Sequence, residues 1–272
     1  MAFLNNNKSK ANIVMLKKSV FVLNSLVSKN IRAQYRNSTL GVVWTVLNPL
    51  LNMLVMALVF GQFFGRTMPN VDYPVYVLAG NTVFGLLRMT TTSGLTCMVE
   101  NYDMLTKTRI PYYVFPVSHL LSAVVNFGFS FIALLIVMLI RIPNGVKFYW
   151  TMLMTIVPFL PALMLFSLGI ALILATMYVR FRDIKHFYGV ILTLWTYLTP
   201  LFYNDAILSP KVRYLMNFNP MYHFVKYFRD IVQSGIVPSL ESHLIIYGCG
   251  IAALTIGLLA FGSQKKKFIM YI

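Results

Sequence analysis

An uncharged apolar run near the start of the chain constrains the fold more than any other feature. Residues 42–64 contain no charged side chain. At about 1.5 Å per residue, a helix of this length crosses the roughly 30 Å hydrocarbon core of a bilayer with some tilt. Basic residues precede the run and mark the side from which the chain enters the membrane. We therefore expect a chain built from membrane-spanning helices.

Composition and further apolar runs extend this expectation to the whole chain. The sequence is 58% hydrophobic and 11% charged, whereas soluble domains carry about 25% charged residues. Pro158 and Pro161 fall inside one long run, which predicts a kink or a broken start there. The sequence predicts an all-α integral membrane protein, a single domain over residues 1–272 with six transmembrane helices at about 42–64, 76–98, 114–140, 148–179, 187–203 and 244–261.

Residues 13–36 have the pattern of an amphipathic helix. Its apolar side chains fall on one face and its basic side chains on the opposite face. Such a helix lies in the membrane interface with its cationic face towards headgroups or water. A plain basic anchor that only sets orientation remains the alternative.

Two short helices are expected within residues 209–234. Ser209-Pro210 and Asn219-Pro220 each place a capping residue before a proline at the first helical position. The second helix carries Phe224 and Phe228 on one side, and Gly235 follows its end. A helix of this length cannot cross the hydrocarbon core, so the pair is predicted to be interfacial or re-entrant.

The net charge of +16 could indicate nucleic acid, but the basic residues sit beside apolar spans. Orientation in the bilayer and contact with anionic membrane lipids explain this placement better, so no nucleic-acid partner is expected. With six spans, most Lys and Arg residues fall on the side of the two termini. This bias predicts that both termini are cytoplasmic.

The sequence offers few groups for chemistry. It contains no phosphate-binding loop motif and no metal-binding motif, and its acidic residues lie in loops or at span ends. The pattern argues against an ion-coupled carrier and against a membrane enzyme, and no cofactor or metal is expected in this chain. Arg88, inside the second span, is the exception: it is a functional candidate, unless that span is bent or sits lower in the membrane.

Aromatic residues are abundant. Tyr188, Trp195 and Phe202 recur every seven residues and so share one helix face, and the first span ends with Phe60, Phe63 and Phe64. Aromatic faces stack on the C–H faces of sugars, which suits a conduit for a sliding glycan. Ordinary packing and an interfacial aromatic belt are the alternative.

Several spaced motifs resemble one known family. They are Tyr35-Arg36-x-Ser38-x-Leu40-Gly41-x-x-Trp44-x-x-x-Asn48-Pro49-Leu50, the segment Trp195-x-Tyr197-Leu198-Thr199-Pro200-Leu201-Phe202-Tyr203, and Asn217-x-Asn219-Pro220-Met221. Together they resemble the ABC-2 type permeases that export polysaccharide, O-antigen or teichoic acid, over about residues 29–261. Phe84 stands where that family often has Trp, and Arg88 stands where a small or apolar residue is expected.

The resemblance implies a partner arrangement. Two copies of this chain would form a channel, and two copies of a separate nucleotide-binding subunit would bind ATP and Mg²⁺ and drive it. The loops 99–113 and 180–186 would dock into that ATPase, through the residues Glu100, Asp103, Lys107, Arg109, Arg180, Arg182, Asp183 and Lys185. Residues 209–234 would form external gate helices, with Pro220, Phe224 and Phe228 as gate residues.

The resemblance also implies the cargo, a glycan on an undecaprenyl-pyrophosphate-type lipid in a bacterial cytoplasmic membrane. Its pyrophosphate needs cations at the interface, and Lys29, Arg32 and Arg36 are placed for that role. Two rivals stay open. One is an ABC-2 permease for a small molecule or drug, and the other is a membrane glycosyltransferase or acyltransferase, for which no acid–base pair can be assembled from this sequence.

Overall fold

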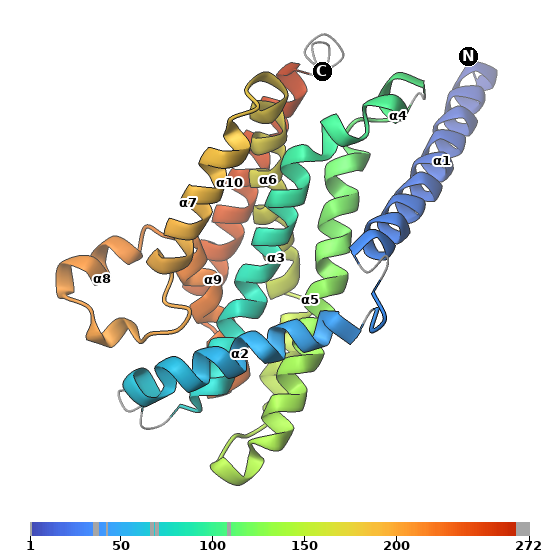
Figure 1. Cartoon of the computed structure of the whole chain (residues 1–272). Coiled ribbons are helices and arrows are strands. Elements are labelled where there is room, and N and C mark those ends of the chain that lie inside the picture. The colour runs from blue at the N-terminus through green and yellow to red at the C-terminus, as the bar shows by residue number, and fades with distance from the viewer. Residues whose placement is uncertain are drawn as a thin grey trace.

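The computed structural model describes residues 2–34, 38–41, 43–65, 68, 71–107 and 110–264, with only the backbone over 2–17. Every regular element in the described part is a helix (Figure 1). The longer elements are α1 (Ala2–Gln34), α2 (Val43–Phe64), α3 (Tyr73–Glu100), α4 (Tyr102–Lys107), α5 (Val114–Ile140), α6 (Phe159–Arg180), α7 (Ile184–Leu198), α8 (Pro210–Met216), α9 (Pro220–Arg229) and α10 (Leu240–Gln264). Short 3₁₀ helices η2 (Ile142–Asn144), η3 (Trp150–Thr155) and η4 (Asp205–Ile207) and a π-helical turn, η5 (Asp230–Ser234), lie between them.

Four segments of the described chain are long and apolar enough to cross a membrane: α2, Trp150–Arg180, α5 and α10. The expected spans 76–98 and 187–203 are helical in α3 and α7, but α3 carries Arg88 and a run of hydroxyl side chains, and α7 has only 15 residues. Because α7 ends at Leu198, it is shorter than expected; Pro200 disfavours helical geometry at Thr199. Six crossings therefore stay a prediction.

Proline breaks the long run 148–179, as its sequence suggested. The run begins as η3 and becomes α-helical only at Phe159, directly after Pro158. Pro161 falls in the first turn of α6, where its missing N–H leaves no helical hydrogen bond unmade.

Helix α1 runs from Ala2 to Gln34, so it extends well before the expected start at residue 13. Its C-terminal part packs on α5: Leu26 is buried beside Phe115, and Asn30 Nδ2 lies 3.5 Å from Ser118 Oγ. Figure 1 places the start of α1, α4, the turn between α6 and α7, and the end of α10 at one end of the bundle. Helix α8 and η2 lie towards the other end.

The core lies among α3, α5, α6 and α9. Phe159 is fully buried at the start of α6, and its ring centroid lies 5.1 Å from that of Phe228 and 6.2 Å from that of Phe224. Helix α9, expected at an interface or as a re-entrant element, packs into the bundle with most of its side chains buried.

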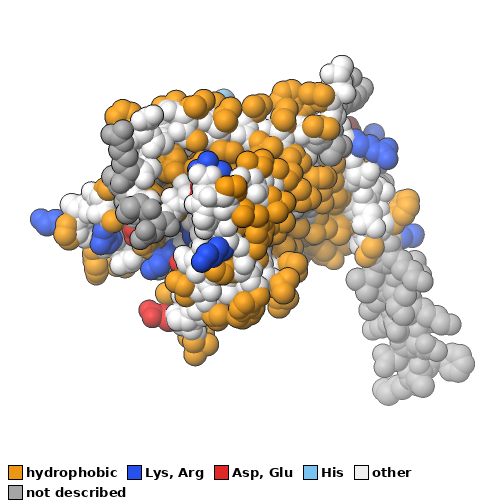
Figure 2. All heavy atoms as spheres, turned by 90° about the horizontal axis from the view of Figure 1, so that it is seen from below, with side chains coloured by type: hydrophobic (Ala, Val, Ile, Leu, Met, Phe, Trp, Pro, Cys, Tyr) orange, Lys and Arg blue, Asp and Glu red, His pale blue; other side chains and the backbone are white. Residues whose placement is uncertain are grey.

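The exterior is strongly apolar. Helix α2 crosses α3 and α5 obliquely (Figure 1), and its outward face leaves Leu58 71% and Phe63 73% exposed. Figure 2, viewed from the end that carries α8 and η2, shows broad hydrophobic areas with separate groups of Lys and Arg. Such a surface needs lipid or protein around it rather than water.

Candidate functional site

A groove lies where α2 passes over α3, close to the end of α7. It encloses about 390 Å³. Its lining combines amide, hydroxyl, guanidinium and aromatic side chains, with these members: Asn48, Pro49, Asn52, Met56, Phe60, Asn81, Thr82, Phe84, Gly85, Arg88, Ser130, Thr196, Tyr197 and Phe202. A mainly apolar groove that also carries amides, hydroxyls and a guanidinium is the candidate functional site.

Two helix faces supply the polar side of the groove. Asn48 and Asn52 are one turn apart on α2, and Asn81 and Arg88 are two turns apart on α3, with Gly85 between them. Asn48 and Arg88 stand out in the sequence, but Asn52 and Asn81 were not predicted. Amides that recur at helical spacing inside apolar runs are the signal that would have identified them.

Arg88 is exposed towards the groove near the middle of α3. Its Nη2 donates to Thr196 Oγ1 at 3.2 Å, and its Cζ lies 5.5 Å from the centroid of the Phe84 ring. Among the described residues Arg88 forms no ion pair. The guanidinium therefore keeps its charge and most of its donors available.

Aromatic rings form the other wall. The centroids of Phe60 and Phe202 are 5.9 Å apart, and those of Phe202 and Tyr197 are 5.8 Å apart. The structure thus brings together two of the six residues expected to line a glycan channel, one from α2 and one from the segment after α7. Phe64 stacks on Phe60 at the end of α2, with the centroids 5.8 Å apart.

The remaining three expected channel residues lie away from this groove. Tyr188 is 5% exposed, and its hydroxyl donates to Thr91 Oγ1 at 2.6 Å inside the bundle. Trp195 packs edge-on against Phe84 and Phe166. Phe63 points outward from α2. The stripe at seven-residue spacing therefore faces the bundle interior over most of α7.

Trp195 also links α7 to the segment that begins α9. Its Nε1 donates to Asn219 Oδ1 at 2.8 Å, and that oxygen also accepts from the backbone N–H of Met221. Asn219 Nδ2 in turn donates to Thr199 Oγ1 at 3.0 Å. Asn219 is thus the side-chain cap of α9, as its sequence predicted, and a cross-link between two elements. Pro220, Phe224 and Phe228, the residues predicted to form a gate, follow this link, and both phenylalanines are fully buried.

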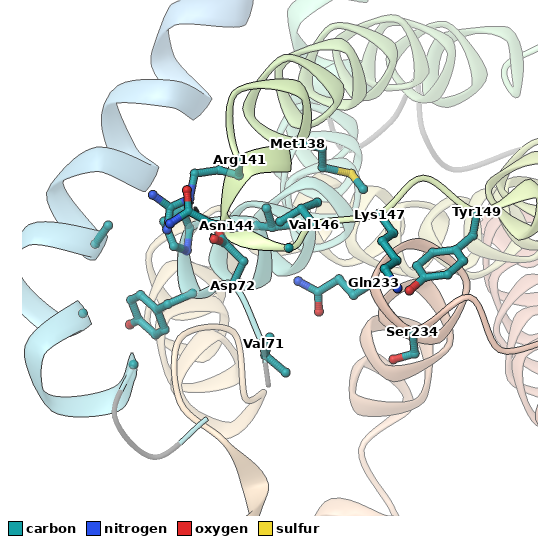
Figure 3. Close-up of a pocket in the computed structure, with 17 residues that line it drawn as sticks. Val71, Asp72, Met138, Arg141, Asn144, Val146, Lys147, Tyr149, Gln233 and Ser234 are labelled. Carbon is teal, nitrogen blue, oxygen red and sulfur yellow. Dashed lines mark hydrogen bonds and ion pairs between the residues drawn. The ribbon is translucent and has the colours of Figure 1, made fainter. Parts of the chain in front are cut away.

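A second, larger cavity of about 710 Å³ lies at the end of the bundle near η2 (Figure 3). Arg141 Nε lies 2.7 Å from Asp72 Oδ2, so this arginine is already neutralised. Lys147 and Tyr149 line the same cavity, and Gln233 Nε2 has no hydrogen-bond partner among the described residues.

Lys29 and Arg32 lie on an exposed side of α1. Lys29 and Arg32, three residues apart, are both exposed and line a shallow depression with Ser25 and Ser28. Arg36 lies outside the described residues, as does Arg109. Lys29 and Arg32 are both accessible to an anion.

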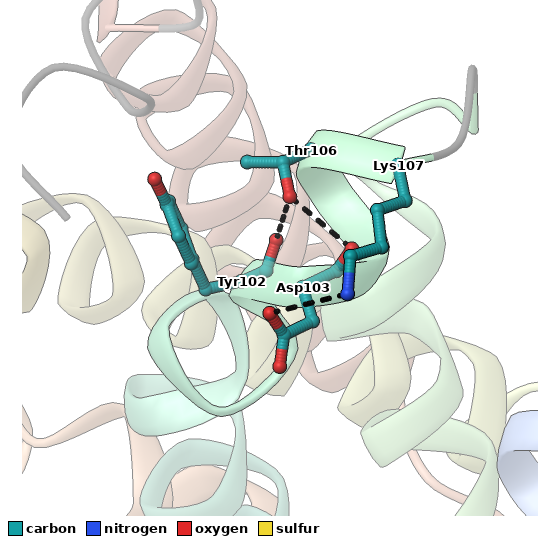
Figure 4. A network of polar contacts seen from close by, with 4 residues as sticks. All are labelled: Tyr102, Asp103, Thr106 and Lys107. Atoms are coloured by element: carbon teal, nitrogen blue, oxygen red, sulfur yellow. Dashed lines mark hydrogen bonds and ion pairs between the residues drawn. The ribbon is translucent and has the colours of Figure 1, made fainter.

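Those residues expected to contact an ATPase that lie in the described part of the chain are solvent-accessible. On α4, Lys107 Nζ lies 3.8 Å from Asp103 Oδ1 with both side chains highly exposed, and Thr106 donates to the backbone (Figure 4). Between α6 and α7, Arg182 lies over the Tyr178 ring. The other members of the set, Glu100, Arg180, Asp183 and Lys185, are also exposed. Both groups lie at the end of the bundle where α1 begins (Figure 1).

In the described part of the chain, no group of three His, Cys, Asp or Glu side chains could hold a metal ion. Among the described residues that line the groove, Arg88 and the Tyr197 phenol are the only ionisable groups, and they do not form an acid–base pair. Its amide, hydroxyl and aromatic side chains are of the kinds that contact polar molecules such as sugars.

Comparison with known proteins gives a consistent result. The sequence model described as ABC-2 type transporter matches residues 22–232. The O-antigen export system permease protein RfbA of Myxococcus xanthus is 30% identical over 91% of this chain and 94% of that protein. A Klebsiella pneumoniae protein of the same name is 25% identical over 89% of this chain and 92% of its own length. The polysialic acid transport protein KpsM of Escherichia coli is 22% identical over 90% of this chain and 94% of that protein.

Proposed function

This chain belongs to the ABC-2 type transporter family, and from that premise we propose that it is the membrane permease subunit of a polysaccharide exporter. The observation that carries the proposal is the near full-length match to permeases named for O-antigen export and polysialic acid transport. Permeases of this family work with a nucleotide-binding subunit. ATP and Mg²⁺ would bind to that partner, and this chain would be a transport subunit of a bacterial cytoplasmic membrane.

The groove supports a glycan as cargo. Amides such as Asn52 and Asn81 exchange hydrogen bonds with sugar hydroxyls, and the rings of Phe60, Tyr197 and Phe202 offer flat apolar faces. A small apolar drug would not need this number of amides, and a transferase would need an acid–base pair that the groove lacks. The lining therefore favours a glycan over both rivals.

A second copy of the chain would complete the conduit. Helix α2 forms one wall of the groove, while its other side exposes apolar residues including Leu58 and Phe63. In the proposed homodimer, the channel would pass along this wall. Phe63, Tyr188 and Trp195 remain proposed channel residues through a rearrangement that turns them towards the cargo, and residues 209–234, with Pro220, Phe224 and Phe228, would gate the exit.

The lipid carrier would be recognised at α1. We propose that Lys29, Arg32 and Arg36 bind the pyrophosphate of an undecaprenyl-pyrophosphate-type lipid, with both termini cytoplasmic. The exposure of Lys29 and Arg32 on one side of α1 supports this role. Guanidinium groups suit it because they donate two parallel hydrogen bonds to phosphate oxygens.

Deleting the gene for this chain in its host tests the proposed function. We expect surface polysaccharide to be lost and lipid-linked glycan to accumulate inside the cell, because synthesis continues without export. The measurements are glycan staining of intact cells and analysis of extracted lipid-linked sugars. Normal surface polysaccharide after deletion would refute the proposal, and accumulation of a small molecule instead would favour the drug-permease rival.

Docking to the ATPase can be tested by charge reversal. We propose that α4 and the turn between α6 and α7 contact the nucleotide-binding subunit. Arg182→Glu should weaken that contact about tenfold, since it sets a like charge against a complementary surface. Co-purification and surface binding measurements with the ATPase would detect the change. Lys147→Glu, an equal reversal at the other end of the bundle, is the control; equal effects of both variants would exclude a specific contact at Arg182.

A further inference from the structure

Arg88 sets the groove apart from a plain sugar-binding surface. It is a charged residue near the middle of a helix that is otherwise mostly buried, and a charge at membrane depth is costly unless it faces protein or water. The structure directs it into the groove, level with Gly85 and Thr196. The chain thus places a cation where a passing cargo would meet it.

The charge of Arg88 is not neutralised by its surroundings. Its one described hydrogen bond goes to a neutral hydroxyl of Thr196, and that hydroxyl donates in turn to the Leu192 carbonyl at 2.8 Å. None of the described residues that line the groove is acidic. A guanidinium has five N–H donors in a planar fork, so Arg88 has donors free for a two-oxygen anion.

The other lining residues do not distinguish a charged sugar from a neutral one. The amides of Asn48, Asn52 and Asn81 are able to hydrogen-bond the hydroxyls of any sugar, and the aromatic wall offers a flat surface to any sugar ring. The single cation is therefore the element of the groove that can distinguish one glycan class from another. Arg141 cannot do the same in the second cavity, because Asp72 already pairs with it.

We propose that Arg88 binds acidic groups of the exported polymer, so that the cargo is an anionic glycan bearing carboxylate or phosphate ester groups. This inference rests on the proposed function and specifies its substrate class. The pyrophosphate of a lipid carrier shares the same chemistry. It carries several negative charges, however, and calls for a group of cations such as that on α1, whereas the groove has one.

The test measures binding to the complex of this chain with its ATPase in lipid nanodiscs. The probes are a short oligogalacturonate, its neutral methyl ester of equal length and inorganic pyrophosphate, each titrated by saturation-transfer NMR. Wild type should bind the oligogalacturonate about tenfold more tightly than the ester, because one charged hydrogen-bonded contact contributes on the order of that factor. Arg88→Gln should remove this preference, and Arg88→Lys should retain most of it.

Lys147→Gln removes the same charge in the second cavity and should leave the preference unchanged. Equal binding of acid and ester by wild type would overturn the inference while leaving the proposed function intact. Loss of pyrophosphate binding alone in Arg88→Gln would also overturn it, and would assign Arg88 to the lipid carrier. Failure of wild type to bind either sugar would count against both the inference and the proposed function.

Discussion

Replacing Arg229 with Met is expected to destabilise the bundle around α9 by roughly 3 kcal/mol or more, because three backbone carbonyls would lose the guanidinium as a donor. The side chain is 8% exposed. Its Nη1 donates to the Pro200 carbonyl at 2.7 Å, and its Nη2 donates to the carbonyls of Leu201 at 2.8 Å and Tyr76 at 3.2 Å. Thermal unfolding of the purified chain in detergent would measure the loss.

The contacts of Arg229 explain why the expected effect is large. The segment after α7 has no regular structure, and its carbonyls at Pro200 and Leu201 cannot be satisfied by a helix or a sheet. The guanidinium also stacks on Tyr76, with Cζ 3.4 Å from the ring centroid. Burial lowers the pKa of Arg229 to about 10, which still leaves it protonated at neutral pH. One side chain thus joins α9, α3 and the segment after α7.

Two further variants sharpen the test of Arg229. Arg229→Lys should be destabilised as well, though less, because an ammonium cannot present the planar fork that reaches three carbonyls. Lys226→Met, on an exposed position of the same helix, removes an equal charge and should unfold near the wild-type temperature. If Arg229→Met were as stable as the wild type, water or other groups would have to satisfy these carbonyls.

The burial of Arg229 could not be predicted from the sequence. From the sequence, Arg229 is a basic residue near the end of a short helix that is predicted to be interfacial or re-entrant. Its burial follows from the way the Pro200–Leu201 segment folds back onto α3, which no local pattern encodes. The same holds for Trp195: its seven-residue spacing with Tyr188 correctly predicts one shared helix face, but not that this face points into the bundle.

Predictions that depend on local physics succeeded better. The apolar runs predicted α2, α5 and α10, because length and hydropathy alone decide whether a helix can cross a bilayer. Asn219-Pro220 correctly predicted a helix start. The expected helix over residues 220–233 is α9 only as far as Arg229, and it continues as the π-helical turn η5, which Gly235 follows with φ +64°. The groove could not be predicted in the same way. Asn52 and Asn81 belong to different helices and meet only because α2 crosses α3.

The second large effect is expected at the contact between α6 and α10. Substituting Gly257 with Val should separate these helices and lower stability by at least about 3 kcal/mol. A side chain at Gly257 would place its first carbon 2.5 Å from the Gly169 carbonyl oxygen and 3.0 Å from the Gly169 Cα. Both neighbours are backbone atoms, so the clash cannot be relieved by a rotamer change.

The reciprocal contact is equally close. A first side-chain carbon at Gly169 would lie 2.3 Å from the Ala253 carbonyl carbon. Small residues on both helices therefore let the backbones meet, and in a membrane such close packing replaces the hydrophobic effect that holds soluble helices together. Figure 1 shows the two helices side by side.

Matched glycine substitutions on α10 separate this contact from helix propensity. Gly248 lies on the same helix, and a side chain there would meet nothing within 4 Å. Gly248→Ala should therefore leave the protein unchanged or stabilise it by up to about 1 kcal/mol, since Ala favours helix over Gly. Gly257→Ala gains the same helix propensity as Gly248→Ala. If only Gly257→Ala unfolds at a lower temperature, the cause is therefore the loss of close packing between α10 and α6. If the two alanine variants unfolded at the same temperature, the close contact between α6 and α10 would not contribute to stability. Helix α10 would then be held by its apolar surface instead.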